Sequence, residues 1–385
     1  MIKLVNNTIS LEEIDDLCKW LQTYPQLTKG EITERFEEQW SSWLGSKYSV
    51  FVNSGSSANL AMAHVSKISG LLKNDTIIAP CLCWATTISP FMQLGFNIVL
   101  CDTDRRNLGM DPIHFERLCE QHSPSCVILT HILGFPNDME RILKICKDYD
   151  ILVLEDTCES VGSKFNGKNL GLFGAMSSFS TYFGHHFSTI EGGLVSTDSF
   201  ELYEILKSIR SHGWSRDLST PTKKKLQEKY SIDKFNDMYT FYHSGFNIRS
   251  TDLQAFLGVT QLKSLDYKNS IRYKNLVAYD DLIENDYWKI DISQFDFISN
   301  FAYPIIHPKK IEIASALISA NIECRPLVCG NIGKQPFYSS VYGLSKYDFA
   351  DIVHEYGLYV PNHPDLTYED IESISKIINS ITTMK

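Results

Sequence analysis

Short runs rich in β-branched and other apolar residues alternate with longer stretches of helical periodicity from about residue 46 onward. This alternation predicts βαβ units and therefore an α/β fold with a mostly parallel central sheet flanked by helices. In such a sheet, ligands bind beyond the carboxyl ends of the strands, so the residues after each run are candidates for a site. The expected strands are Tyr48–Val52, Thr76–Ala79, Asn97–Cys101, Ser125–Thr130 and Ile151–Leu154.

The length of 385 residues allows two domains, each with its own core. Apolar residues at helical spacing between Leu11 and Leu21 predict an amphipathic N-terminal arm. A long helical stretch, roughly Thr251–Leu282, is expected to lead into a smaller α+β domain. We therefore expect the arm and a large domain in residues 1–260, and a small C-terminal domain in residues 261–385.

Composition excludes several classes of protein. The formal net charge of -10 argues against nucleic acid as a partner, because phosphate backbones attract basic surfaces. The ten cysteines show no metal-binding spacing, and Cys81-Leu82-Cys83 is too tight for a zinc hairpin. The N-terminus lacks the apolar run of a signal peptide, and polar residues and prolines interrupt the most apolar window, Ile77–Leu100. These features favour a cytoplasmic protein with reduced thiols and no membrane span or metal site.

A turn rich in glycine and serine follows the first expected strand. The run Asn53-Ser54-Gly55-Ser56-Ser57-Ala58 precedes an expected helix, Asn59–Val65. Small residues at a helix start expose backbone N–H groups, and the helix dipole attracts an anion there. An ordinary helix N-cap uses the same residue types, so the turn alone leaves both readings open.

Two further motifs follow the fifth expected strand. The apolar run Leu152-Val153-Leu154 ends in Glu155-Asp156, and a later segment runs from Phe179 to Gly193, with His185 six residues before Glu191-Gly192-Gly193. Together these motifs resemble the cofactor-binding core of the sugar aminotransferase and dehydratase family that uses pyridoxal phosphate. In that family a lysine before the Glu-Gly-Gly forms a Schiff base with the cofactor. Here a histidine stands in its place, as in the branch of the family that removes a hydroxyl from a keto-sugar.

The resemblance extends from about residue 30 to the end of the chain. It implies the aspartate aminotransferase-like fold of type I. It also implies that Gly55 and Ser56 hold the cofactor phosphate, and that Ser180 is the second serine that binds this phosphate.

The resemblance gives three more residues a place around the cofactor ring. Asp156 would hold the pyridine nitrogen protonated, although from the residues alone it is equally well a loop or N-cap acid. Glu159 stands where the aminotransferases usually carry glutamine, and the dehydratase branch has an acid there. Trp84 would stack on the ring, whereas core packing is the usual role of a lone tryptophan.

Histidine cannot form the lysine's bond to the cofactor, but it moves protons near neutral pH. The resemblance therefore implies that His185 is the catalytic base, working with non-covalently bound pyridoxamine phosphate. It would take a proton from the cofactor and then assist the departure of the C3 hydroxyl of a 4-keto sugar. L-Glutamate would restore the amine of the cofactor. For His186 we expect a packing or supporting role.

The resemblance also implies an obligate homodimer with shared sites. Asn247 would reach the cofactor phosphate of the neighbouring subunit, and His212 and Arg216 would bind substrate, as would Arg249 and Arg325. From the residues alone, Asn247 and Arg249 form a capped helix entry, and Arg325 is equally well a surface arginine. An arginine suits diphosphate because its planar guanidinium donates two parallel hydrogen bonds.

The leading hypothesis is a 3-dehydratase that acts on a nucleotide-linked 4-keto-6-deoxy sugar. Similarity favours GDP as the nucleotide, and the sequence leaves open whether the sugar is a hexose or a heptose. Two alternatives remain: an ordinary sugar aminotransferase, which the missing lysine opposes, and a non-enzymatic protein that binds a sugar nucleotide.

Overall fold

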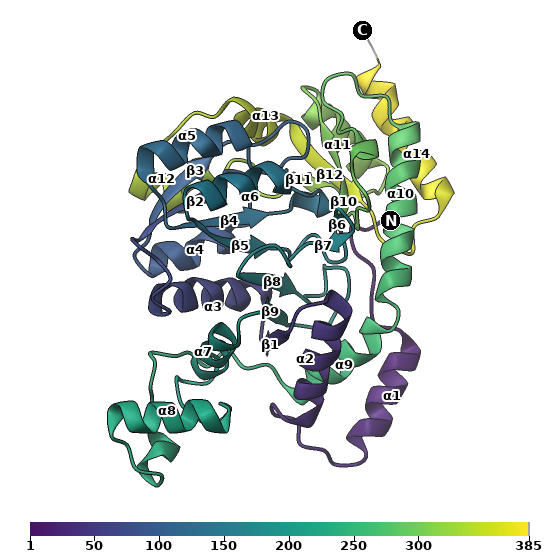
Figure 1. Ribbon diagram of the computed structural model, residues 1–385. Coiled ribbons are helices and arrows are strands. Elements are labelled where there is room, and N and C mark those ends of the chain that lie inside the picture. Colours follow the sequence, from purple (N-terminus) through teal and green to yellow (C-terminus); the bar gives the residue numbers. More distant parts are fainter. Residues whose placement is uncertain (384–385) are drawn as a thin grey trace.

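The computed structural model describes residues 1–383 (Figure 1). Its helices are α1 (Leu11–Leu21), α2 (Glu31–Leu44), α3 (Gly55–Ile68), α4 (Ala85–Gln93), α5 (Pro112–His122), α6 (Met139–Asp148), α7 (Phe200–Arg210), α8 (Thr220–Tyr230), α9 (Asp252–Leu262), α10 (Leu265–Leu282), α11 (Lys310–Ser319), α12 (Pro336–Tyr342), α13 (Asp348–Tyr356) and α14 (Tyr368–Thr382). Its strands are β1 (Tyr48–Val52), β2 (Thr76–Pro80), β3 (Asn97–Cys101), β4 (Cys126–Thr130), β5 (Leu152–Asp156), β6 (Lys164–Phe165), β7 (Lys168–Asn169), β8 (Met176–Ser180), β9 (Gly193–Thr197), β10 (Ala302–Ile306), β11 (Arg325–Pro326) and β12 (Gly357–Pro361).

The central sheet has seven strands in the order β1-β9-β8-β5-β4-β2-β3. Only β9 runs against the others, because it pairs antiparallel with both β1 and β8 while the remaining pairs are parallel. The expected α/β fold with a mostly parallel sheet is confirmed. The sheet places the ends of β1, β5 and β8 at one edge, which carries the turn after Val52, the carboxyl of Asp156 and the hydroxyl of Ser180.

Helices cover both faces of this sheet. Consecutive strand residues point to opposite faces, so Ile77 packs into one core, shared with α3, and Ile78 into another, shared with α5 and α6. A third cluster around Trp40 and Phe36 of α2 packs against β1, β8 and α9. Buried on both faces, the strands are rigid supports for the residues that follow them.

A smaller sheet of order β10-β12-β11 lies beside the large one, with α11 and α14 nearby (Figure 1). The sequence predicts one helical stretch over Thr251–Leu282, but the structure divides it into α9 and α10, which are separated by Lys263 and Ser264. The N-terminus joins this region, because Ile2 pairs with Ile322 in a parallel bridge. A domain boundary between residues 260 and 261 stays a prediction.

The segment that contains α8 projects from the body of the molecule (Figure 1). No residue of α8 is buried, so the three lysines Lys223, Lys224 and Lys225 lie on an open helix. Within residues 1–383, no helix has both the length and the apolar character that crossing a bilayer requires.

Candidate active site

The glycine- and serine-rich turn forms the first turn of α3, which begins at Gly55, four residues before the start that the sequence suggests. Ser54 is the N-cap, and its hydroxyl accepts a hydrogen bond from the Ser57 N–H at 3.0 Å. A Cβ on Gly55 would lie 2.6 Å from the Cβ of Ser180, so only glycine allows this close approach. Hence the helix N-terminus and Ser180 lie side by side.

A hydroxyl from a third element joins this turn. Ser56 donates a hydrogen bond to the hydroxyl of Thr86 at 2.9 Å, and Thr86 lies in the first turn of α4. Ser180, in contrast, is buried, and its hydroxyl accepts from the Tyr182 N–H at 3.3 Å. Hydroxyls and helix N–H groups thus converge, which is the arrangement that binds a phosphate.

The carboxylate of Asp156 lies deep in the site and is fixed by neutral donors. Its Oδ2 accepts from Asn59 Nδ2 at 2.9 Å and from Thr87 Oγ1 at 2.7 Å. Its Oδ1 accepts from the Cys158 N–H at 3.2 Å. With no cation of the chain within ion-pair distance among the described residues, this buried carboxylate is free to pair with a protonated ring nitrogen.

Glu159 is a second carboxyl group in the same cavity. One of its oxygens accepts a hydrogen bond from the Leu133 N–H at 2.9 Å. Burial raises the pKa of Glu159 to about 7, because the charged form loses solvation, and Asp156 adds to this rise. Glu159 therefore gains or loses a proton near neutral pH.

His185 faces the cavity, and its Nδ1 is buried without a hydrogen-bond partner among the described residues. Burial lowers the pKa of His185 to about 4, although the backbone of Cys158 and the charge of Asp156 act in the opposite direction. The imidazole is therefore neutral at physiological pH and able to accept a proton.

One cavity of about 500 Å³ brings these groups together. Trp84 is its exposed aromatic wall, with 57% of its surface accessible, so this side chain is not packed in the core. Arg325 of β11 lines the same cavity and is exposed, as expected for a residue at its mouth. The residues predicted from the sequence that line the cavity are Gly55, Ser56, Trp84, Asp156, Glu159, Ser180, His185 and Arg325.

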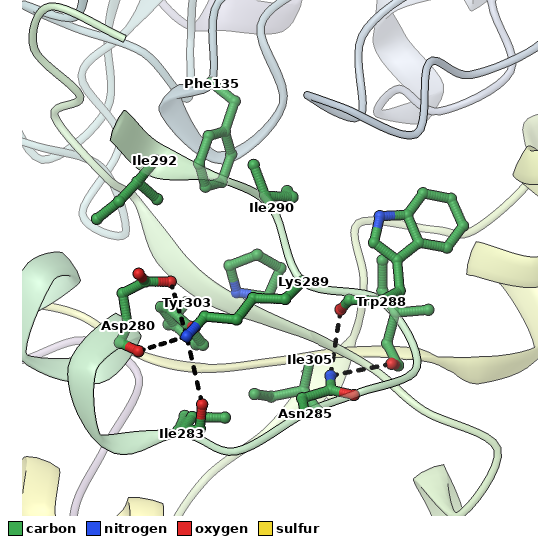
Figure 2. Close-up of a pocket in the computed structure, with 12 residues that line it drawn as sticks. Phe135, Asp280, Ile283, Asn285, Trp288, Lys289, Ile290, Ile292, Tyr303 and Ile305 are labelled. Atoms are coloured by element: carbon green, nitrogen blue, oxygen red, sulfur yellow. Dashed lines mark hydrogen bonds and ion pairs between the residues drawn. The ribbon is translucent and has the colours of Figure 1, made fainter. Parts of the chain in front are cut away.

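A second hollow lies between the end of α10 and β10, where Lys289 pairs with Asp280 at 3.5 Å (Figure 2). Its volume is about 10 Å³, which is close to the space that a single water occupies. This hollow is a packing defect and not a candidate site.

The remaining predicted residues lie outside the cavity of their own chain and form a separate group. Arg249 donates to the side-chain oxygen of Asn247 at 3.0 Å, and its Nη2 lies 3.4 Å from His212 Nε2. Arg216 lies over the ring of Trp214 at 4.2 Å. The chain alone therefore brings the glycine- and serine-rich turn, Asp156 and His185 together in one cavity, while this second group lies outside that cavity.

Sequence reasoning missed several lining residues because their roles depend on contacts between distant segments. Asn59 of α3 and Thr87 of α4 donate hydrogen bonds to Asp156, yet in the sequence each looks like an ordinary helical residue. Thr86 is the one with a usable signal, because it follows Trp84 at a helix start. Arg272 of α10 and Tyr359 of β12 come from the second sheet region and carry no local motif.

The geometry fits pyridoxal phosphate or its amine form. The turn before α3 offers N–H groups and hydroxyls for the phosphate, Asp156 lies where a ring nitrogen would need a carboxylate, and Trp84 offers an aromatic face. His185 lines the same cavity, and its Nδ1 has no hydrogen-bond partner among the described residues. The fold and the site therefore define a protein of the pyridoxal phosphate-dependent class.

Comparison with known proteins gives the family. A model of the DegT/DnrJ/EryC1/StrS aminotransferase family matches residues 8–379, and the chain belongs to this family.

Within the family, the chain is 35% identical over 367 residues to the GDP-4-keto-6-deoxy-D-mannose 3-dehydratase of Yersinia pseudotuberculosis, a match that covers 91% of each protein. Two crystal structures of a GDP-4-keto-6-deoxymannose 3-dehydratase are similar in fold, each with a TM-score of 0.89 over 98% of this chain and 100% of the other. One, at 32% identity, is a histidine-to-asparagine variant with bound GDP-perosamine. The other, at 31% identity, contains a trapped PLP-glutamate geminal diamine.

Proposed function

We propose that this chain is a pyridoxal phosphate-dependent 3-dehydratase that removes the C3 hydroxyl of a nucleotide-linked 4-keto-6-deoxy sugar. The observation that carries the proposal is His185: it faces the cavity in the place where the aminotransferases carry their lysine. Among the described residues that line the cavity there is no lysine at all. The relatives named above support GDP as the nucleotide and L-glutamate as the amino donor.

Six residues of the chain surround the cofactor in this proposal. Gly55 and Ser56 bind its phosphate at the start of α3, and Ser180 binds the phosphate from the opposite side. Asp156 keeps the ring nitrogen protonated, and Trp84 stacks on the ring face. Glu159 lines the same cavity and contacts the substituents of the cofactor ring in this proposal. These contacts are non-covalent, so the cofactor is exchangeable.

Bound pyridoxamine phosphate supplies the amine that condenses with the sugar ketone and a ring that accepts electron density. The neutral imidazole of His185 accepts the proton released at the C4′ carbon, because its lowered pKa leaves it uncharged. His185 then donates this proton to the C3 hydroxyl oxygen as the carbon–oxygen bond breaks, so that water leaves. One side chain thus serves as base and then as acid.

The group of Asn247, Arg249, His212 and Arg216 completes the site of a neighbouring subunit in this proposal. Each lies outside the cavity of its own chain, and Arg249 already orders Asn247 and His212 by hydrogen bonds. A homodimer with shared sites follows. Arg325 at the mouth of the cavity binds the diphosphate of the sugar nucleotide. We place the enzyme in the cytoplasm, where nucleotide sugars and glutamate are both available.

Shared sites predict a specific result for mixed dimers. A dimer with His185→Asn in one subunit and Asn247→Ala in the other has one site with both defects and one intact site. Random mixing of the two inactive variants therefore restores about a quarter of the wild-type activity. Absence of any recovery in dimers shown to exchange subunits contradicts the shared site.

The reaction itself is tested by product analysis. The purified protein is incubated with pyridoxal phosphate, L-glutamate and GDP-, CDP- or dTDP-linked 4-keto-6-deoxy sugars. The masses of the products are then determined by mass spectrometry. A sugar that has lost one oxygen, with GDP as the preferred nucleotide, supports the 3-dehydratase. An amino sugar identifies an aminotransferase, and no cofactor binding at all identifies a non-enzymatic relative.

A further inference from the structure

A buried cation that takes no part in the proposed reaction lines the cavity. Arg272, near the middle of α10, is 3% exposed and is among the lining residues. Its Nη1 donates hydrogen bonds to the carbonyl oxygens of Phe301, at 3.2 Å, and Asn362. Its Nε is buried with no acceptor among the described residues.

No carboxylate of the described chain lies within ion-pair distance of Arg272, unlike the other fully buried arginine, Arg210, which pairs with Glu37. Asp365 acts on Arg272 only from a distance. Burial lowers the pKa of Arg272 to about 10, so the side chain still carries its charge at neutral pH. An arginine that is buried and charged without a carboxylate partner is costly in a protein, so an anion bound in the cavity would stabilise it.

The segment Pro361-Asn362-His363-Pro364 holds Arg272 in place. The carbonyl oxygen of Asn362 accepts from the guanidinium, while the Asn362 amide donates to the Arg272 carbonyl at 3.1 Å. Asn275 and Tyr279, further along α10, donate to the carbonyl oxygens of His363 at 3.1 Å and of Pro361 at 2.9 Å. This network fixes one edge of the guanidinium, and within residues 1–383 its Nε has no acceptor.

Arg272 is close to the proposed base. The ring of Phe301, whose carbonyl binds Arg272, lies 5.3 Å from the ring of His185. Burial lowers the pKa of His185, His186 and His363, and the charge of Arg272 adds to this lowering, so the arginine is the fixed positive charge beside three neutral histidines.

We propose that Arg272 binds a carboxylate of the amino donor L-glutamate. This inference rests on the proposed function, in which glutamate and the keto-sugar react in turn at the same place. The donor's amine must approach the reacting atoms beside His185, and Arg272 is the buried cation that lines the same cavity and can bind the donor's carboxylate. The sugar that replaces glutamate carries only hydroxyls there, and its diphosphate reaches outward to Arg325, which is exposed. In this proposal the buried Arg272 binds the carboxylate of glutamate, and the exposed Arg325 binds the diphosphate of the sugar nucleotide.

Binding of glutarate, a dicarboxylate without the reactive amine, tests this assignment on the holoenzyme. Calorimetry is expected to show that Arg272→Met weakens glutarate binding at least tenfold, and that Arg272→Lys weakens it less because the charge remains. GDP binding should change less than twofold in both variants. The matched control Arg325→Met should show the opposite pattern, with weaker GDP binding and unchanged glutarate binding. Equal glutarate affinity in wild type and Arg272→Met, or no glutarate binding to wild type, overturns the proposal.

A crystal structure of the wild-type holoenzyme with glutarate gives a readout that needs no variant to fold. One carboxylate is expected within hydrogen-bond distance of the Arg272 guanidinium, and glutarate bound elsewhere overturns the assignment. The half-reactions separate this proposal from the proposed function. Conversion of the pyridoxal form to the pyridoxamine form by glutamate should need a higher half-saturating glutamate concentration in Arg272→Met than in wild type, while wild-type enzyme already in the pyridoxamine form should dehydrate one equivalent of sugar. If the wild type binds glutarate at Arg272 but never dehydrates the sugar, only the proposed function fails.

Discussion

The Nε2 of His186 lies 2.9 Å from the carbonyl oxygen of Ser299, in a fully buried contact that turns this imidazole away from the cavity. The two adjacent histidines therefore have different surroundings, and only His185 lines the site. Their adjacent positions in the sequence do not distinguish the roles of His185 and His186, but their contacts in the structure do.

This contact predicts that His186 stabilises the fold. His186→Ala removes a buried hydrogen bond and leaves a cavity, so the free energy of unfolding should fall by roughly 2–4 kcal/mol. Dehydratase turnover by the folded fraction should fall less than tenfold. Denaturant unfolding and a turnover assay check both values, and a loss of turnover as large as that of a His185 variant would contradict the division of roles.

The hydrogen bonds to Asp156 predict that its charge is essential for turnover, and that several donors together fix the orientation of its carboxylate. In Asp156→Asn the side chain no longer balances a protonated ring nitrogen, and only its single amide oxygen can still accept a hydrogen bond from Asn59 or Thr87. Turnover should fall at least a hundredfold. Thr87→Val removes a single donor and should cost roughly tenfold in turnover. Steady-state kinetics at saturating cofactor measure both turnover rates. Equal turnover in Asp156→Asn and Thr87→Val would contradict the role of the Asp156 charge.

The exposed position of Trp84 predicts that its removal lowers cofactor affinity without lowering the stability of the fold. Because the side chain is largely exposed, Trp84→Ala should leave the unfolding midpoint of the protein without cofactor nearly unchanged. Loss of ring stacking should weaken pyridoxamine phosphate binding roughly tenfold, and Trp84→Phe should restore part of it. Calorimetric titration gives the affinities. Destabilisation of the cofactor-free protein with unchanged affinity would show that Trp84 is a packing residue.

Glu159 predicts a pH dependence of stability. Its pKa is about 7 in the folded protein and 4.5 without the fold, so the folded state binds the proton more tightly. The stability that this proton contributes is present below about pH 4.5 and is lost as pH rises through 7. Glu159→Gln does not titrate, so in the cofactor-free protein it should match wild type at pH 4.5 and exceed it by roughly 1–3 kcal/mol at pH 8. A difference that stays constant from pH 4.5 to 8 would contradict the raised pKa.

Local pattern is sufficient for those parts of the molecule in which neighbours in sequence are neighbours in space. The strand Tyr48–Val52 has the expected bounds, because its apolar run ends where the turn begins. The start of α3 is less well predicted, since Ser54 caps a helix whose first turn reads as a loop. The break between α9 and α10 has no glycine or proline to mark it.

The site is predictable where a motif carries it and hidden where only long-range contacts do. Asp156 and His185 are singled out because the motifs around them resemble those of a known family, and the structure places both in one cavity. Asn59 and Thr87 reach Asp156 across 97 and 69 positions of the chain, and neither has a local signal. Arg272 looks like one arginine of a long polar helix until its burial and its missing carboxylate partner are known.

The central claim is that the imidazole of His185 moves the proton that allows the hydroxyl to leave. The most direct measurement is a single turnover of GDP-linked 4-keto-6-deoxymannose by enzyme preloaded with pyridoxamine phosphate, comparing wild type with His185→Asn. Cofactor binding should be preserved in the variant, while the rate of oxygen loss from the sugar falls by a factor of roughly 10²–10⁴. A variant that binds the cofactor and dehydrates the sugar at the wild-type rate would contradict the account.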